Sequence, residues 1–202
     1  METCNEDIYR LLAACFYPPA PALLEEGCCT NLAALLASSC PHAAQQATEA
    51  ARLLHDADPQ ELLVEYSRLF LGPFKLVAPP YGSVWLDQSK AVMGESTARV
   101  AAFYQSHGLQ LAEDFPELPD HITAELEFLS YLAFRQREAT TAGDNAGTAA
   151  YIQAQQEFLA SFLLPWLTLF CEAISDDGEA PFYAAIAQCT LAFTTAQVTD
   201  HA

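Results

Sequence analysis

The sequence EYSRLFLGPFKLVAPPYGSVWLD spans residues 65–87 and changes character in its middle. Its first part continues an amphipathic helical pattern, and its second part is rich in Pro, Gly and aromatic residues. Connections longer than about 12–15 residues are uncommon in compact domains unless they are functional or disordered. Phe74, Tyr81 and Trp85 argue against disorder, because solvated linkers contain few aromatic residues. We therefore expect an ordered loop that shapes a binding surface.

The segments on both sides of this loop have apolar residues at helical spacing, and no strand-like alternation persists. We expect an all-α protein that forms one globular unit. Its N-terminal half covers residues 1–112, a hinge loop covers 113–121, and its C-terminal half covers 122–202. The expected helices run from Asn5 to before Pro18, from Pro21 or Ala22 to about Leu36 across Gly27, from Pro41 to about His55, from Pro59 to Phe70 with Asp58 as the cap, from near Ser96 to before Gly108, from Ile122 to a polar loop at 140–148, from about Thr148 to Ser175 with an interruption near Pro165, and from Pro181 to Gln197.

The chain is strongly acidic. It has 202 residues, with 8 Lys and Arg against 26 Asp and Glu, so the formal net charge is −18. Such a field repels the phosphate backbone of nucleic acids and the surface of anionic membranes. We expect no nucleic-acid partner. A basic partner would be attracted, although acidity also keeps ordinary proteins in solution.

The expected compartment is the cytoplasm. No apolar run approaches the roughly 18 residues of a membrane span, so we expect no integral membrane segment. The N-terminal METCNEDIYR is acidic and lacks the basic region and apolar stretch of a secretory signal. The seven cysteines form no CxxC pair, and the adjacent Cys28 and Cys29 suit neither a zinc knuckle nor an easy disulfide. We expect reduced thiols, with no bound metal and no cofactor.

Tyr66, Leu69 and Phe70 lie at i, i+3 and i+4 and therefore share one helical face. Taken alone, this pattern is typical of core packing. Two features favour a binding surface instead. Gly72-Pro73 stops the helix, so Phe70 lies at its end, where a groove can open. Pro79-Pro80-Tyr81 presents an aromatic ring on an extended backbone. Facing one another, these elements would form an apolar trough for a helical or extended peptide.

A second cluster reads ELPDH at residues 117–121. Asp120 follows a proline and precedes a helical pattern, so it is a good candidate for the N-cap. His121 and Glu125 lie at i, i+4 and could share a metal with Asp120, yet no further His or Cys lies at a ligand-like spacing. The chain has no nucleophile in a glycine-flanked turn and no phosphate-binding loop. No catalytic residue is therefore assigned.

Taken together, these residues resemble the TorD/DmsD family of cytoplasmic maturation chaperones for molybdenum-cofactor oxidoreductases. Members carry a Trp or Tyr followed by xxLF, then an APPxxS-type loop, then ExPDH. Order and spacing agree over about residues 65–121, and the helical pattern agrees over the whole chain. The matching segments are YSRLF at 66–70, GP at 72–73, APPYGSVW at 78–85, GEST at 94–97 and ELPDH at 117–121.

The resemblance implies an all-helical, single-domain bundle that binds the twin-arginine leader, or another segment, of an apo-molybdoenzyme and delays its export until the cofactor is inserted. Either a monomer or a domain-exchanged dimer is compatible with it. Nothing in the sequence itself supports the guanine-nucleotide binding associated with the family. Tyr66 and Tyr81 stand where several members carry Trp, which narrows the aromatic surface. The implied leader-binding residues are Tyr66, Leu69, Phe70, Pro80, Tyr81, Gly94, Asp120 and His121.

In this interpretation the apolar stretch of the leader lies against the aromatic and proline residues, Asp120 pairs with a leader arginine, and His121 orients it or the loop. A chaperone for a subunit that stays in the cytoplasm, like the nitrate reductase assembly chaperones, is a variant of the same function. Two other classes stay open. One is a metal-dependent enzyme that uses Asp120, His121 and Glu125, and the other is an acidic helical adaptor without leader specificity.

Overall fold

The structure, a computed structural model, describes residues 5–20, 23, 26–72, 76–112 and 115–199. Within these residues all regular secondary structure is helical, apart from one isolated β-bridge. The fold class predicted from the sequence is therefore confirmed. The helices are α1 (Asn5–Cys15), α3 (Cys28–Leu36), α4 (Pro41–Asp56), α5 (Pro59–Tyr66), the π-helical turn η1 (Ser67–Leu71), α6 (Gly82–Leu86), α7 (Glu95–Ser106), α8 (Ile122–Thr141), α9 (Asn145–Phe158), the π-helical turn η2 (Leu159–Leu163), α10 (Leu164–Asp177) and α11 (Pro181–Thr199).

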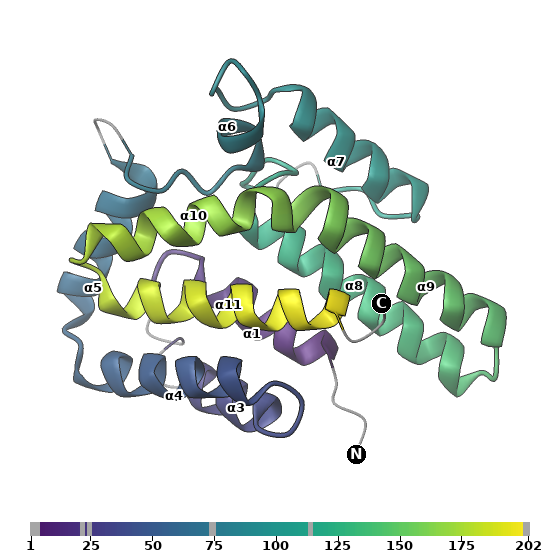
Figure 1. Ribbon diagram of the computed structural model, residues 1–202, viewed down its shortest axis with the longest axis horizontal. Coiled ribbons are helices and arrows are strands. Elements are labelled where there is room, and N and C mark those ends of the chain that lie inside the picture. Colours follow the sequence, from purple (N-terminus) through teal and green to yellow (C-terminus); the bar gives the residue numbers. More distant parts are fainter. Residues whose placement is uncertain (1–4, 21–22, 24–25, 73–75, 113–114, 200–202) are drawn as a thin grey trace.

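The helices pack as an irregular bundle (Figure 1). α11 lies between α10 and α4, and α3 packs on α4 at the edge of the bundle. α1 packs on α8, which in turn packs on α9. The short helices α6 and α7 lie beyond α10, on the side opposite α3 and α4. The APPYGS and ELPDH motifs lead into α6 and α8, and both of these helices contact α10.

Local sequence signals account for several helix ends. Asp58 caps α5, because its side chain accepts hydrogen bonds from the backbone N–H groups of Gln60 at 2.7 Å and Glu61 at 3.4 Å. Gly108 follows α7 with φ of +78°, the left-handed conformation that ends helices. These two expected boundaries are confirmed. The helix expected to be interrupted near Pro165 instead continues from Asn145 to Asp177, with only the π-helical turn η2 before Pro165.

One expected helix boundary was wrong. Gly27 was expected inside a helix, but it has φ of +62° and precedes α3, because its left-handed backbone cannot belong to a right-handed helix. The expected starts at Pro21 or Ala22 lie outside the described residues. The helix expected to reach Phe70 is confirmed, since η1 extends α5 to Leu71. The loop after it is less irregular than expected, because α6 forms at Gly82–Leu86.

α9, η2 and α10 form a continuous helical stretch, Asn145–Asp177, which by length and composition is apolar enough to cross a membrane. A stretch of this kind was not expected from the sequence, in which no apolar run was found to approach roughly 18 residues. Its most apolar window is 44% buried inside the protein. Phe158, Trp166 and Phe170 within it are fully buried core residues, so packing within the protein accounts for much of its apolar character.

Candidate functional site

The APPYGS and ELPDH motifs meet at an antiparallel β-bridge between Tyr81 and His121. Next to it, the N–H of Gly82 donates to the carbonyl of Asp120 at 2.8 Å. The Tyr81 ring packs edge-on against the His121 ring, with centroids 4.9 Å apart. Sequence reasoning singled out both motifs for one site, and the structure brings them into direct contact.

Asp120 does not cap the helix that follows it. Its Oδ2 accepts a hydrogen bond from the backbone N–H of Ser83 at 2.8 Å, so the side chain caps α6. His121 is the N-cap of α8 instead, because its Nδ1 accepts from the N–H of Thr123 at 3.2 Å. The expected role of Asp120 as N-cap of α8 was therefore wrong. The β-bridge is the physical reason, since it holds Asp120 against the first turn of α6.

Two buried carboxylates near this bridge each keep one oxygen without a partner. Asp120 is 0% exposed and its Oδ1 accepts no hydrogen bond, and Glu125 is 1% exposed with an unpartnered Oε1. The other oxygen of Glu125 accepts from the Trp166 indole N–H at 3.3 Å. A buried acceptor without a partner costs about 1–3 kcal/mol or more when it is charged. Such an oxygen needs a partner from outside the chain, such as a water molecule, an ion or a ligand.

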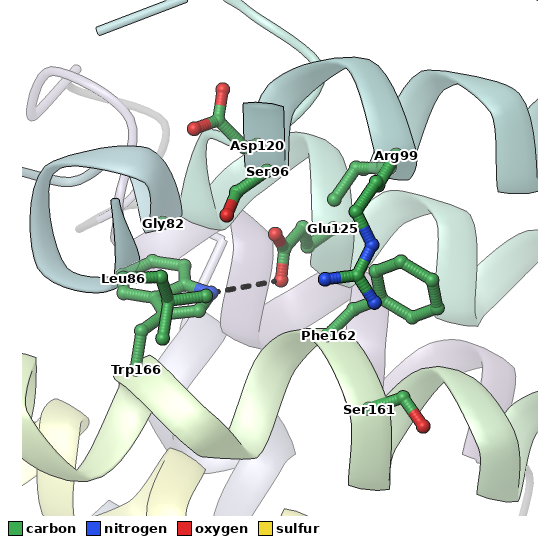
Figure 2. A pocket seen from close by; sticks show the side chains of 10 residues that line it. Gly82, Leu86, Ser96, Arg99, Asp120, Glu125, Ser161, Phe162 and Trp166 are labelled. Atoms are coloured by element: carbon green, nitrogen blue, oxygen red, sulfur yellow. Dashed lines mark hydrogen bonds between the residues drawn. The ribbon is translucent and has the colours of Figure 1, made fainter. Parts of the chain in front are cut away.

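Both carboxylates line one cavity, which we call the carboxylate cavity. It also has Gly82, Ser96, Leu86, Arg99, Phe162 and Trp166 in its wall, and its volume of about 10 Å³ has room for about one water molecule. Figure 2 shows the Trp166 indole reaching Glu125 from α10 and the Arg99 side chain lying over the Phe162 ring. Arg99 and Leu86 line the cavity and are themselves exposed to solvent.

Gly82 allows the indole to lie against the start of α6. A Cβ at this position would meet the Trp166 Nε1 at 3.0 Å, tighter than ordinary van der Waals contact. The glycine therefore lets α6 and α10 approach closely enough for Trp166 to reach Glu125.

Burial sets the protonation of the site. Desolvation raises the pKa of Glu125 well above its usual range, and the nearby Asp120 charge raises it further, while the Trp166 hydrogen bond opposes both. Desolvation also lowers the pKa of His121 to about 4, so this histidine is neutral near pH 7. Its Nε2 lies 3.8 Å from a Glu117 carboxylate oxygen, but a neutral ring forms no ion pair there.

Replacing Glu125 by Gln should change the pH dependence of stability. The pKa of Glu in an unfolded chain is about 4.3, and the pKa of Glu125 in the folded protein is raised. Between these two pKa values the unfolded chain loses the carboxyl proton while the folded protein keeps it. The wild type therefore loses up to about 1.4 kcal/mol of unfolding free energy per pH unit above pH 4.3. Glu125→Gln should match the wild type near pH 4 and exceed it by more than about 1 kcal/mol at pH 7.

Urea unfolding at pH 4, 5.5 and 7 measures this difference. Glu157→Gln is the control, because Glu157 is exposed on α9. A difference between Glu125→Gln and wild type that stays constant with pH would contradict the neutral buried carboxyl.

Gly94 lies at the start of α7 rather than in the carboxylate cavity. Asp87 caps this helix, since its carboxylate accepts from the Ser96 N–H at 3.2 Å and from the Ser96 hydroxyl at 2.5 Å. A Cβ on Gly94 would collide with Oδ2 of Asp87. The backbone of Gly94 is extended, with φ of −84°, so the position requires space rather than a left-handed conformation.

Gly94→Ala should therefore lower the unfolding free energy by about 1–2 kcal/mol, because the added methyl displaces the Asp87 cap. Thermal unfolding monitored by circular dichroism measures the loss. In an Asp87→Ala background the same substitution should have little further effect. An equal loss in both backgrounds would show that Gly94 does not act through Asp87.

The expected apolar trough at the end of α5 is absent from the described residues. Tyr66, Leu69 and Phe70 are only 2%, 0% and 3% exposed. The Phe70 ring contacts those of Tyr66, Tyr183, Phe170 and Phe16, with centroids 5.1, 5.3, 5.9 and 6.4 Å apart. In this conformation the three predicted trough residues belong to the core. Their involvement in leader binding stays a prediction.

The other predicted residues lie nearer the bridge. Pro80 is buried, and its carbonyl accepts from the N–H of Ile122 at 2.9 Å. Tyr81 is half-buried, and its hydroxyl donates to Glu117 at 2.8 Å. Pro80, Tyr81, Asp120 and His121 thus form one group, which excludes the YxxLF segment.

Sequence reasoning missed the neighbours of Asp120. Glu125 was considered only as a metal ligand, and Trp166 and Arg99 were not singled out. Within the described part of the chain, no three His, Cys, Asp or Glu residues are placed to hold a metal ion. The metal-dependent alternative built on Asp120, His121 and Glu125 therefore has no structural support. A buried Glu on the inward face of a helix was the one signal that could have indicated the cavity.

Known proteins resemble this chain over most of its length. The sequence model described as the nitrate reductase delta subunit matches residues 34–172. The chain belongs to this family. Two relatives are named chaperones. The Tat proofreading chaperone DmsD of Salmonella typhimurium is 31% identical over 123 residues, and the match covers 61% of this chain and 53% of DmsD. The chaperone protein TorD of Vibrio cholerae is 32% identical over 143 residues, covering 70% of this chain and 63% of TorD.

The predicted resemblance to the TorD/DmsD chaperones is thus confirmed, and these relatives are named chaperones rather than enzymes. The family member described here spans between about half and two thirds of the length of these relatives. A crystal structure from Archaeoglobus fulgidus, of a protein assigned to redox enzyme maturation, has the same fold. It has a TM-score of 0.59 and 24% identity, and the match covers 93% of this chain and 92% of that one.

Proposed function

We propose that this protein is a cytoplasmic chaperone that binds the twin-arginine leader of an apo-molybdoenzyme and holds the precursor until its cofactor is inserted. The similarity to proteins named Tat proofreading chaperone and chaperone TorD supports the class of function. The observation that carries the proposal is the pair of buried, unpartnered carboxylate oxygens on Asp120 and Glu125.

A guanidinium group suits a buried carboxylate of this kind. It is planar and offers several N–H donors, so it can bond to one carboxylate through two hydrogen bonds. Its hydrophobic face stacks on aromatic rings, and the cavity wall contains Phe162 and Trp166. The chain's own Arg99 already lies over Phe162, 5.5 Å from the ring centroid. The site therefore already accommodates one guanidinium beside the cavity.

A leader arginine needs more room than the closed cavity provides. Leu86 and Arg99 lie at the solvent side, Leu86 with 42% exposure, and their movement would open the cavity. Val92 and Met93, which are 47% and 73% exposed, lie in the neighbouring connection between α6 and α7. We assign the apolar stretch of the leader to Leu86, Val92 and Met93, because the residues first expected to receive it are covered by the core.

Leader binding should release a proton. The free site keeps Glu125 protonated because desolvation raises its pKa, whereas a bound guanidinium favours the ionised carboxylate. Each complex that forms therefore loses this proton to solvent. By linkage the affinity rises with pH, by up to about tenfold per pH unit, until the free carboxyl itself ionises.

Calorimetric titration with a synthetic leader peptide tests the proposal. A peptide with paired arginines and its apolar stretch should bind with a Kd of about 1 μM or below, which is typical of a releasable client. The same peptide with both arginines replaced by Gln should bind at least about tenfold more weakly. Equal affinities for both peptides would overturn the proposal. Binding that is lost for both peptides in high salt would identify the acidic-adaptor alternative instead.

A further inference from the structure

Three buried cysteines cluster where the end of α1 meets the start of α3, far from the carboxylate cavity in sequence. The Sγ of Cys15 lies 3.7 Å from the Sγ of Cys28 and 4.0 Å from that of Cys29. All three are free thiols. Sulfur atoms at these separations are close to van der Waals contact, and a disulfide brings its two sulfurs to about 2.05 Å.

The environment distinguishes Cys28 from the other two thiols. Cys28 and Cys29 are the first two residues of α3, where the positive end of the helix dipole stabilises a thiolate. Hydrogen bonds from the Cys15 and Cys29 thiols lower the pKa of Cys28, Arg10 lowers it further, and desolvation opposes them. The pKa of Cys15 is raised. Cys28 is also the most exposed of the three, at 5% against 0% and 1%.

We propose that Cys28 and Cys15 form a peroxide-sensitive thiol pair that closes a disulfide between α1 and α3. The Cys28 thiolate attacks one oxygen of hydrogen peroxide, which breaks the O–O bond, forms a sulfenic acid and releases hydroxide. The Cys15 sulfur then attacks the sulfenic sulfur and forms the S–S bond, and the hydroxyl leaves with the thiol proton as water. Overall two thiols are oxidised and one peroxide is reduced to two waters.

Cys15 is the resolving thiol for a geometric reason. Its Sγ is 3.7 Å from Cys28, whereas a bond between the adjacent Cys28 and Cys29 would close a strained ring within one helical turn. The new bond would close the chain from residue 15 to residue 28. It would hold the end of α1, a helix that packs on α8, to α3. The oxidised protein should therefore resist unfolding more than the reduced protein does.

Peptide mapping after peroxide treatment tests the proposal on the full chain. Cleavage after glutamate places Cys15 in peptide 7–25 and places Cys28, Cys29 and Cys40 in peptide 27–49. Low peroxide should link these two peptides in the wild type, and dithiothreitol should separate them. The midpoint of thermal unfolding should rise by about 5 °C on oxidation.

Two matched variants identify the partner of Cys15. Cys29→Ala should still form the linked peptides, while Cys28→Ala should lose them, with circular dichroism confirming that each variant is folded. A linked product that forms equally fast in Cys28→Ala would assign the reaction to Cys29 or Cys40 and overturn the proposal. Wild-type protein that gives no linked peptides, or only sulfinic acid at Cys28, would also overturn it without any variant.

Discussion

The double substitution Leu69→Ala and Phe70→Ala is expected to unfold most of the protein. Both side chains are buried in the core, at 0% and 3% exposure. Removing a buried Leu costs about 2–5 kcal/mol and removing a buried Phe about 3–5 kcal/mol. The two residues are neighbours, so their losses do not simply add. Their combined loss is nevertheless comparable with the whole stability of a typical domain, about 5–15 kcal/mol.

Urea unfolding followed by circular dichroism measures this loss. Leu71→Ala is the matched control, because Leu71 belongs to the same π-helical turn but is 59% exposed. It should change the unfolding free energy by less than about 1 kcal/mol. A double variant that keeps the wild-type unfolding midpoint would contradict the core assignment. It would return Leu69 and Phe70 to the open trough that the sequence first suggested.

Asp120→Asn is expected to weaken leader binding by about 10- to 150-fold while leaving the fold intact. The amide oxygen can still accept from the Ser83 N–H, so the cap on α6 is kept. The substitution removes the negative charge that would meet the leader guanidinium. Titration calorimetry measures the affinity, and urea unfolding measures the stability.

Ser96→Ala is a suitable control for this experiment. Ser96 lines the same cavity, but its hydroxyl is already bonded to Asp87 rather than directed at a ligand. It should alter the leader affinity by less than about threefold. If both variants weaken binding equally, the effect of Asp120 comes from general damage to the cavity and not from its charge.

The helical pattern and the helix ends at Asp58 and Gly108 were predictable because their signals are local. Asp58 before Pro59 caps α5 as the sequence indicates, and Gly108 follows the end of α7. The contact between the APPYGS and ELPDH motifs was anticipated only as a shared site. The β-bridge that joins Tyr81 to His121, and that turns Asp120 toward α6, connects segments 40 residues apart and has no local signal.

The sequence could not show whether Tyr66, Leu69 and Phe70 are exposed or buried. An apolar helical face has the same residue pattern whether it lines an open groove or packs in the core. Phe70 is covered by Phe16, Phe170 and Tyr183, which come from distant parts of the chain. Glu125 likewise follows an ordinary helical pattern. Its burial depends on Trp166 from α10, about 40 residues away. Because of this tertiary packing, the candidate site is the carboxylate cavity and not the aromatic end of the helix that the sequence predicted.

A double-mutant cycle tests the central claim most directly. The wild-type protein and the Asp120→Asn variant are each titrated with three leader peptides. One peptide carries both arginines, and in each of the other two a different arginine is replaced by Gln. If a leader guanidinium binds the Asp120 carboxylate, one arginine should show a coupling energy of about 1.5–3 kcal/mol with this substitution. Coupling near zero for both arginines, with stability unchanged, would contradict the claim.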